Sequence, residues 1–386
     1  MLDVERRYID RQNSTFAHKK HNSLSIKSEF SFKSRPASAI SRQENPLMNR
    51  KKIEPDVRLL ESDLMALTTD FLLSHGLNVP QAHSLARILV AAQRDGSWSH
   101  GLQRLPGTLD TMSHPRFNKQ ADPAPESVSA AAVRIDAQYG FSCLAAERGI
   151  EALVEKTKQI GIGLLAVKNG FHSTALWPLI ERIAEAGLVG LSMNPTHAWV
   201  APAGGTKGLL GTNPLAFAWP RKDKPPYVFD FATSAASRAD IAMHRNCGEE
   251  IPDNWGVNAQ GERTTDPAEV LAGAMLPFGG HKGSAIATLI ELMAGPLIGD
   301  RTSRLSQDFD QGANAAPCHG ELLLAFSPDI IGGADASDDA EAVFAGFSDQ
   351  GARLPGDRRY RMREVSAREG IAVSSALLDR IRSLVR

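Results

Sequence analysis

The fold class is decided by the stretch AAVRIDAQYGFSCLAAERGIEALVEKTKQIGIGLLAVKNGFHSTALWPLIERIAEAGLVGLSM, which covers Ala131–Met193. In it three short apolar runs, AAVRID, IGLLAV and LVGLSM, alternate with two longer segments whose apolar residues recur at helical spacing. We predict strands for the three runs and helices over Phe141–Gln159 and Thr174–Ala186. Alternating strands and helices are typical of α/β or mixed α+β domains.

The sequence on either side extends this pattern. Before it we predict two helices, one capped by Ser62 and ended by Gly76, the other over Pro80–Arg94. After it, LAFAW and YVFDFA predict two strands, Ser284–Ile298 an apolar helix and LLLAF another strand, and two amphipathic helices close the chain. Neither the G-x-G-x-x-G fingerprint of a Rossmann fold nor a Walker A loop occurs. Any nucleotide must therefore bind without them.

Composition excludes several classes of protein. The 386 residues are 42% hydrophobic and 23% charged with a net charge of −1, which predicts a globular protein and no nucleic-acid partner. No apolar run reaches the length of a membrane span. The three cysteines, Cys143, Cys247 and Cys318, are scattered and lack metal-ligand spacing, so we expect reduced thiols, a cytoplasmic protein and no metal site.

The first 53 residues differ from the rest. Asn13–Arg50 is rich in Ser, Lys, Arg and Asn and has few apolar residues, so we predict a disordered extension over residues 1–53. Such a basic, Ser-rich leader could also be a transit peptide, although the acidic residues among the first ten argue against it. A further alternative is an over-extended reading frame whose true start is Met48.

The run RDGSWSHGLQRLPG, Arg94–Gly107, places a titratable group beside a cation. His100 and Arg104 are four residues apart, so in a helix both would project from one face, about 5–6 Å apart at Cβ. A guanidinium holds a carboxylate through two parallel hydrogen bonds, and an imidazole transfers protons near neutral pH. The pair suits a small 2-keto or 2-imino acid. The alternative is a helix start with solvated side chains.

Further stretches carry candidate ligand-binding groups. PAGGTKGLLGTNP (Pro202–Pro214) allows close backbone approach to a ligand, or is a flexible loop. LPFGGHKGSA (Leu276–Ala285) begins a helix behind glycines, which suits phosphate, or is a structural turn. RLPGDRRY (Arg353–Tyr360) sets Arg358 beside Arg359, a pairing that suits the 2′-phosphate of NADP, unless both face water.

Two smaller segments complete this set. FHSTAL, Phe171–Leu176, begins a predicted helix with three hydrogen-bonding side chains that suit a pyrophosphate or a ribose. FDFATSAASRAD ends a strand and delivers Asp230 and Asp240. A buried aspartate could fix the tautomer of His100. The alternative for either carboxylate is a solvated surface acid.

Together these residues resemble the malate/L-lactate dehydrogenase family, the type-2 2-hydroxyacid oxidoreductases. The matching elements are SHG with Arg104 four residues after His100, GTNP, ATSA, GGHKG and the late LPGD, in family order from Arg58 to the C-terminus. Within the family, the forms LPFGGHKGSA and LPGDRRY look most like the Δ1-piperideine-2-carboxylate/Δ1-pyrroline-2-carboxylate reductases. The segment Ala236–Gly256 departs from the family pattern.

The resemblance implies an architecture and a set of site residues. The fold would be mixed α/β with a largely antiparallel, non-Rossmann NADP-binding sheet (131–334), packed on a helical lobe built from residues 54–130 and about 335–386, in a homodimer. His100 would be the proton donor with Ser99 and Asp240 as relay partners, and Arg104 and Thr212 would bind substrate. The implied cofactor-binding residues are His172, Ser173, Thr174, Ala175, Leu176, Asp230, Phe231, Ala232, Lys282, Gly283, Arg353, Leu354, Pro355, Gly356, Asp357, Arg358 and Arg359.

The function implied is NADPH-dependent reduction of a cyclic 2-imino acid at C2 to L-pipecolate or L-proline. The alternative in the same class is a 2-keto/2-hydroxy acid dehydrogenase of malate or L-lactate type. A serine hydrolase built on Ser99, His100 and Asp240 is disfavoured, because adjacent side chains diverge on a helix or strand and no G-x-S-x-G elbow occurs. A non-catalytic nucleotide-binding protein is disfavoured by the intact His100 and Arg104.

Overall fold

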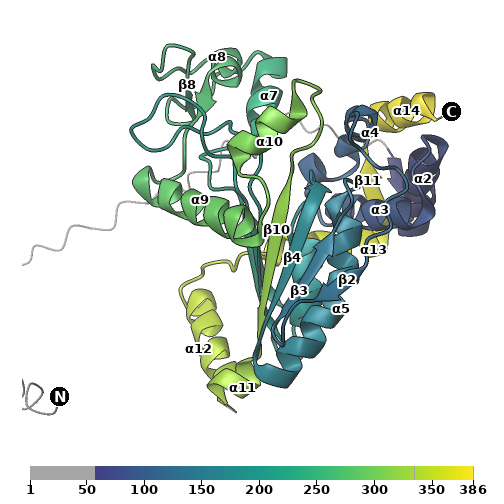
Figure 1. The fold of residues 1–386 in the computed structure, drawn as a ribbon, viewed down its shortest axis with the longest axis vertical. Coiled ribbons are helices and arrows are strands. Elements are labelled where there is room, and N and C mark those ends of the chain that lie inside the picture. The colour runs from purple at the N-terminus through teal and green to yellow at the C-terminus, as the bar shows by residue number, and fades with distance from the viewer. Residues whose placement is uncertain (1–56, 334, 386) are drawn as a thin grey trace, which may run out of the picture. The chain divides into compact units, whose positions relative to one another are not determined.

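The computed structural model describes residues 57–385 except residue 334; the predictions for residues 1–53 lie outside this range. Figure 1 shows the helices and strands in space. The strands are β1 (Val57–Leu59), β2 (Pro125–Ser127), β3 (Ala132–Asp136), β4 (Ile162–Phe171), β5 (Val189–Met193), β6 (Leu215–Trp219), β7 (Tyr227–Phe231), β8 (Gly256–Val257), β9 (Ala274–Met275), β10 (Cys318–Phe326) and β11 (Ile371–Val373).

The α-helices lie between these strands and at both ends of the described chain. They are α2 (Glu61–Ser74), α3 (Val79–Arg94), α4 (Thr108–Ser113), α5 (Ser142–Ile160), α6 (Trp177–Glu185), α7 (Arg238–Cys247), α8 (Pro267–Ala272), α9 (His281–Ala294), α10 (Ser303–Asp310), α11 (Pro328–Gly332), α12 (Ala336–Asp349), α13 (Asp357–Glu369) and α14 (Ser375–Leu384). None of them is both long and apolar enough to cross a membrane.

The central sheet has seven strands in the order β2-β3-β4-β10-β5-β6-β7. Only β3 and β4 pair in parallel, and every other neighbouring pair is antiparallel. The long strand β10 lies between β4 and β5, as Figure 1 shows. The predicted mixed α/β class with a largely antiparallel central sheet is therefore confirmed.

Apolar packing covers both faces of this sheet. The main core joins apolar residues of β3, β4 and β7 to the inner faces of α3, α5 and α6. On the other side, Ile290 and Ala294 of α9 pack against Met193 of β5 and Leu322 of β10. A further apolar cluster is built from loops, α7, α8 and β9, all of which come between β5 and β10 along the chain. Its buried residues include Val200, Ile241, Val270 and Met275.

The two ends of the described chain meet. Strand β1 pairs antiparallel with β11, with Val57 opposite Val373, and α14 contributes Leu378 and Ile381 to the same core as Leu64 and Phe71 of α2. A helical lobe assembled from both ends would bring these segments together, and the lobe itself stays a prediction. The exact boundaries at 130/131 and 334/335 stay predictions.

Several local predictions were wrong at their ends. Helix α2 begins at Glu61 with Leu60 at its N-cap, so Ser62 is not the cap. Helix α6 begins at Trp177 rather than Thr174, and at this start the Asp230 carboxylate accepts hydrogen bonds from the backbone amides of Leu176 and Trp177. Four helices rather than two follow β10 among the described residues, since α11 and α12 precede α13 and α14.

Candidate active site

The predicted acid and anion anchor lie on two short 3-10 turns, Trp98–His100 and Leu102–Arg104, and not on one α-helix. The turns pack on the end of α3, where the buried Gln93 side chain accepts a hydrogen bond from the Leu102 backbone at 3.2 Å. His100 and Arg104 are therefore held together by turn packing, and the helical spacing assumed from the sequence does not apply.

Arg104 is oriented through one edge of its guanidinium. Its Nε donates to the carbonyl of Ser99 at 2.8 Å, whereas its terminal nitrogens make no hydrogen bond to any residue that the structure describes. Burial lowers the pKa of Arg104, yet a guanidinium stays charged in proteins. Two parallel donors with no protein partner are the arrangement that grips a carboxylate.

The environment of His100 disfavours its charged form. Burial, then the positive charges of Arg104 and His172, lower its pKa to about 4. This pKa lies below the ordinary value of a histidine, about 6.5, on which the expected proton transfer near neutral pH relied. A bound carboxylate on Arg104 would offset one of the two neighbouring charges and raise this pKa.

Ser99 is in place as a partner of His100, and Asp240 is not. The Ser99 hydroxyl lies 3.2 Å from His100 Nδ1, because the two residues lie on a 3-10 turn and not on the helix or strand on which adjacent side chains diverge. Asp240 instead accepts from the Ser237 hydroxyl at 2.9 Å at the start of α7, and within the described range it makes no hydrogen bond to His100. Nε2 of His100 likewise has no partner among residues 57–385, so it is the ring nitrogen available to a ligand.

His172 lies in a buried polar cluster with Ser142 and Glu321. Its Nδ1 lies 2.8 Å from the Ser142 hydroxyl and 3.4 Å from Glu321 Oε2, and its Nε2 lies 3.0 Å from the Thr174 carbonyl. Burial lowers the pKa of His172, but Glu321 and the Thr174 carbonyl outweigh it, so the net shift is upward. The His172 ring therefore points into the protein, and its contact with the Thr174 carbonyl holds the loop that begins at His172.

That loop, His172–Leu176, is tied to β7. Asp230 accepts hydrogen bonds from the backbone amides of Leu176 at 2.9 Å and Trp177 at 3.1 Å, so its carboxylate occupies the N-terminus of α6. Burial raises the pKa of Asp230, and these two amides oppose the shift. Ser173 is the only partly exposed residue of the loop. Phe231 is 39% exposed and packs on Phe278, while Ala232 is partly buried.

Thr212 sits on a loop held by a buried polar network. Its hydroxyl lies 3.3 Å from that of Thr196, and its carbonyl accepts from Thr233, two residues after β7. The next residue, Asn213, is fully buried and donates to the buried Glu291 of α9 at 2.8 Å. The GTNP motif therefore anchors the loop that carries Thr212.

Lys282 and Gly283 lie at the start of α9. The helix begins directly after Gly279 and Gly280, whose φ values are +55° and +61°, and a Cβ at either glycine would meet nothing within 4 Å among the described atoms. Lys282 is exposed and Gly283 is buried. The Lys282 amide donates to the Gly279 carbonyl at 3.4 Å. A helix start suits a phosphate in general, and the phosphate-binding role of Lys282 and Gly283 stays a prediction.

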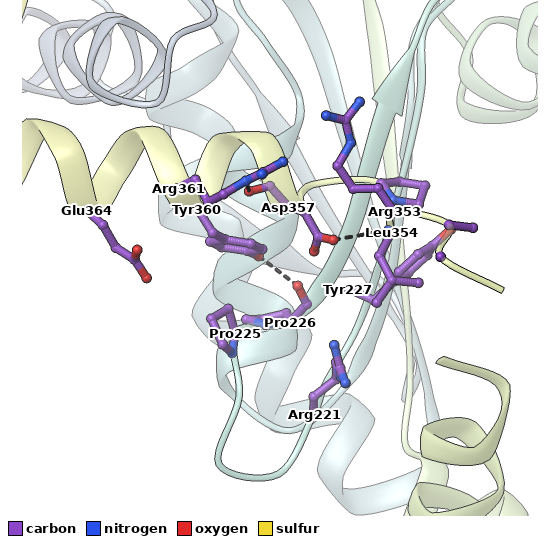
Figure 2. A pocket seen from close by; sticks show the side chains of 13 residues that line it. Arg221, Pro225, Pro226, Tyr227, Arg353, Leu354, Asp357, Tyr360, Arg361 and Glu364 are labelled. Atoms are coloured by element: carbon purple, nitrogen blue, oxygen red, sulfur yellow. Dashed lines mark hydrogen bonds between the residues drawn. The ribbon is translucent and has the colours of Figure 1, made fainter. Parts of the chain in front are cut away.

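The LPGD turn forms the start of α13 and one wall of a pocket of about 460 Å³ (Figure 2). Arg353 is exposed at its edge, Leu354 is buried, and Asp357 accepts from the Leu354 amide at 3.1 Å. Arg358 and Arg359 differ: Arg358 is exposed, whereas Arg359 donates to the Val228 carbonyl at 2.8 Å and lies over Trp177. Pro355 is exposed and Gly356 is partly buried.

These segments fit a nicotinamide dinucleotide by the chemistry they present. Two buried donors, Thr174 Oγ1 within the loop His172–Leu176 and Trp177 Nε1 directly after it, have no hydrogen-bond partner within the described part of the chain. The start of α9 offers amide donors and Lys282, and Arg353 and Arg358 offer exposed guanidiniums. Buried unpaired donors of this kind usually mark a site that a ligand or water satisfies.

Four buried carboxylates were not among the residues predicted from the sequence. Glu321 lies on β10, Glu291 in α9 and Glu181 in α6, and Asp95 follows α3; they are 1%, 6%, 6% and 0% exposed. Each of these carboxylates interrupts or ends an apolar segment of the sequence. A single charge in such a core-facing position is the signal that could have indicated them, because a charge is not buried without partners.

A family model described as malate/L-lactate dehydrogenase matches residues 60–382. A Δ1-pyrroline-2-carboxylate reductase of Pseudomonas fluorescens is 46% identical over 332 residues, 85% of this chain and 99% of the relative. A Δ1-pyrroline-2-carboxylate/Δ1-piperideine-2-carboxylate reductase of Pseudomonas aeruginosa is 46% identical over 324 residues, 83% of this chain and 97% of the relative.

Solved structures agree. The crystal structure of Δ1-piperideine-2-carboxylate reductase from Pseudomonas syringae pv. tomato superposes with a TM-score of 0.82 at 38% identity, covering 85% of this chain and 99% of that one. The chain therefore belongs to the malate/L-lactate dehydrogenase family, and it is an oxidoreductase. The resemblance inferred from the motifs, including its relation to the pyrroline- and piperideine-2-carboxylate reductases, is confirmed.

Proposed function

We propose that this protein reduces a cyclic 2-imino acid, Δ1-piperideine-2-carboxylate or Δ1-pyrroline-2-carboxylate, to L-pipecolate or L-proline with NADPH. The observation that carries the proposal is the pairing of Arg104, whose terminal nitrogens have no protein partner among residues 57–385, with His100, whose Nε2 is equally free there. The names of relatives at 46% identity support the substrate class.

The residues divide the chemistry between them. Arg104 would hold the substrate carboxylate, and Thr212, on the loop anchored by Asn213, would also bind the substrate. Ser99 holds Nδ1 of His100, so that Nε2 delivers a proton to the ring nitrogen. The family implies a nicotinamide cofactor, which supplies a hydride to C2 when bound. Four segments would hold this cofactor: the loop His172–Leu176, Asp230–Ala232, Lys282–Gly283 and the turn Arg353–Arg359.

One assay tests the proposal. Purified full-length protein is mixed with NADPH or NADH and a panel of cyclic imines and 2-keto acids, and cofactor oxidation is followed by absorbance. Turnover of a cyclic imine is the expected result. Turnover of 2-keto acids alone would instead establish a malate- or L-lactate-type dehydrogenase, the alternative that the family description favours. The homodimer and the cytoplasmic location stay predictions.

Arg358 should set the preference for NADPH over NADH. Its exposed guanidinium can meet a 2′-phosphate, whereas Arg359 is engaged with Val228 and Trp177. We expect Arg358→Ala to raise the NADPH Michaelis constant roughly ten- to a hundredfold, since a charge-assisted hydrogen bond contributes about 1.5–3 kcal/mol, and to leave NADH nearly unaffected. Arg368→Ala, at the far end of α13, is the matched control. Equal losses with both cofactors would contradict the assignment.

The pH profile should report the carboxylate bound to Arg104. Reduction needs protonated His100, so the rate falls as pH rises through its pKa. In the free enzyme burial and the charges of Arg104 and His172 lower that pKa to about 4, and neutralising Arg104 raises it. The pH dependence of kcat/KM reports the pKa of the free enzyme, and that of kcat reports the pKa of the enzyme–substrate complex. With a 2-keto acid, which has no imine to titrate, kcat should therefore fall at a higher pH than kcat/KM. Coincident falls of kcat and kcat/KM, or falls that persist in His100→Asn, would contradict this.

A further inference from the structure

A single guanidinium, that of Arg363 in α13, joins two buried carboxylates. Its Nε lies 3.2 Å and 3.1 Å from the two carboxylate oxygens of Asp95, and its Nη2 lies 2.6 Å from Asp95 Oδ2. Its Nη1 and Nη2 donate to Glu181 at 3.2 Å and 2.9 Å. Asp95 is fully buried and Glu181 is 6% exposed. Asp95 also pairs with Arg94, whose Nε lies 2.7 Å from Asp95 Oδ1, but only Arg363 bonds to both carboxylates among the described residues. We call Asp95, Glu181 and Arg363 the junction.

The Asp95 side of the junction fixes the chain just before His100. Asp95 is the C-cap of α3, and the next residue, Gly96, has φ +74° and would bring a Cβ to 3.0 Å from Met362 of α13. Ser366 of α13 donates to the Arg94 carbonyl at 2.7 Å. The start of the turn that carries His100 and Arg104 is therefore set by contacts with α13.

The Glu181 side fixes the segments assigned to the cofactor. Glu181 lies in α6, whose first residue is Trp177, directly after the loop His172–Leu176. The Trp177 ring packs under two guanidiniums of α13, with Arg359 Cζ 5.0 Å and Arg363 Cζ 5.7 Å from its centroid. The turn Arg353–Arg359 leads into the same α13.

We propose that Arg363 is a positioning residue that fixes the His100–Arg104 turn relative to the two cofactor segments at α6 and α13. The proposal rests on the proposed function, which gives those segments their roles. A planar guanidinium can present one edge to Asp95 and another to Glu181, whereas an ammonium cannot hold both in the same geometry. Reacting groups misplaced by about 1 Å lose up to about 10²-fold in rate, so a loosened junction affects turnover from a distance.

The test separates the two sides. We expect Asp95→Asn to lower kcat about ten- to a hundredfold with the NADPH Michaelis constant unchanged, because it loosens only the His100 turn. Glu181→Gln should raise the NADPH Michaelis constant with kcat nearly unchanged, and Arg363→Lys should do both. If Asp95→Asn does not fold, Ser366→Ala replaces it as a milder change on the Asp95 side. Ser366→Ala should also lower kcat and leave the NADPH Michaelis constant unchanged.

The control is Arg87→Lys, because Arg87 makes a comparable two-bond pair with Glu147 between α3 and α5. It should leave both kinetic constants unchanged. A purely structural junction would shift only the melting temperatures of the variants, with kcat and KM unchanged well below the midpoint, and that result would overturn the proposal. So would equal effects of Asp95→Asn and Glu181→Gln on the same constant.

Failure of the proposed function would look different. If the wild-type protein reduced none of the imines or keto acids, the proposed reaction would be wrong, yet NADPH binding could still be followed by fluorescence. Weaker NADPH binding in Glu181→Gln, with unchanged binding in Asp95→Asn, would then still support the junction. Unchanged binding in both variants would overturn it.

Discussion

We expect His100→Asn to lower turnover about 10²–10⁴-fold on every substrate that the wild-type protein accepts, because a positioned general acid contributes about that much. The developing amine or alkoxide must take a proton, and His100 Nε2 has no partner among residues 57–385 to compete for it. A cyclic imine can arrive already protonated, whereas a 2-keto acid cannot. The loss should therefore be at least as severe with 2-keto acids as with imines.

Two measurements accompany this variant. NADPH binding, followed by fluorescence, should survive, since His100 is assigned to the substrate side of the site. His83→Asn, an exposed histidine on α3, is the matched control and should keep wild-type turnover. Wild-type turnover in His100→Asn on every accepted substrate would show that His100 is structural and that the proton donor lies elsewhere.

Arg104→Lys should raise the substrate Michaelis constant strongly, although it preserves the charge. Removal of one charge-assisted hydrogen bond costs about 1.5–3 kcal/mol, which corresponds to roughly ten- to a hundredfold in affinity. A lysine cannot form the planar two-bond grip on a carboxylate, and it also loses the Nε contact to the Ser99 carbonyl at 2.8 Å. Since Ser99 pairs with His100, kcat should fall as well.

The measurement is steady-state kinetics with varied substrate at saturating NADPH. Cofactor affinity should be unchanged, because Arg104 belongs to the substrate side. Arg134→Lys, an exposed arginine on β3, controls for the substitution itself. An unchanged substrate Michaelis constant in Arg104→Lys would place the carboxylate at another residue.

The sequence by itself determined the local elements and the motifs. Helix α3 ends at Arg94 as predicted, because the helical spacing of apolar residues stops at Asp95-Gly96. The runs at Ala132–Asp136 and Val189–Met193 are strands as predicted, because the spacing of apolar residues and the length of a run can be seen in the sequence itself. The motif order from SHG to LPGD also sufficed to identify the family, since several short motifs in a fixed order rarely coincide by chance.

Only the tertiary structure decided how these pieces meet. The insertion of β10 between β4 and β5, and the pairing of β1 with β11, join residues far apart in the chain, and such contacts leave no periodic signal. The low pKa of His100 has the same origin, because it arises from burial and from charges that folding brings close. The junction at Arg363 likewise depends on carboxylates 268 and 182 residues away in sequence. Local residue patterns define elements and candidate chemistry, whereas burial and long-range contacts define the geometry and electrostatics of the site.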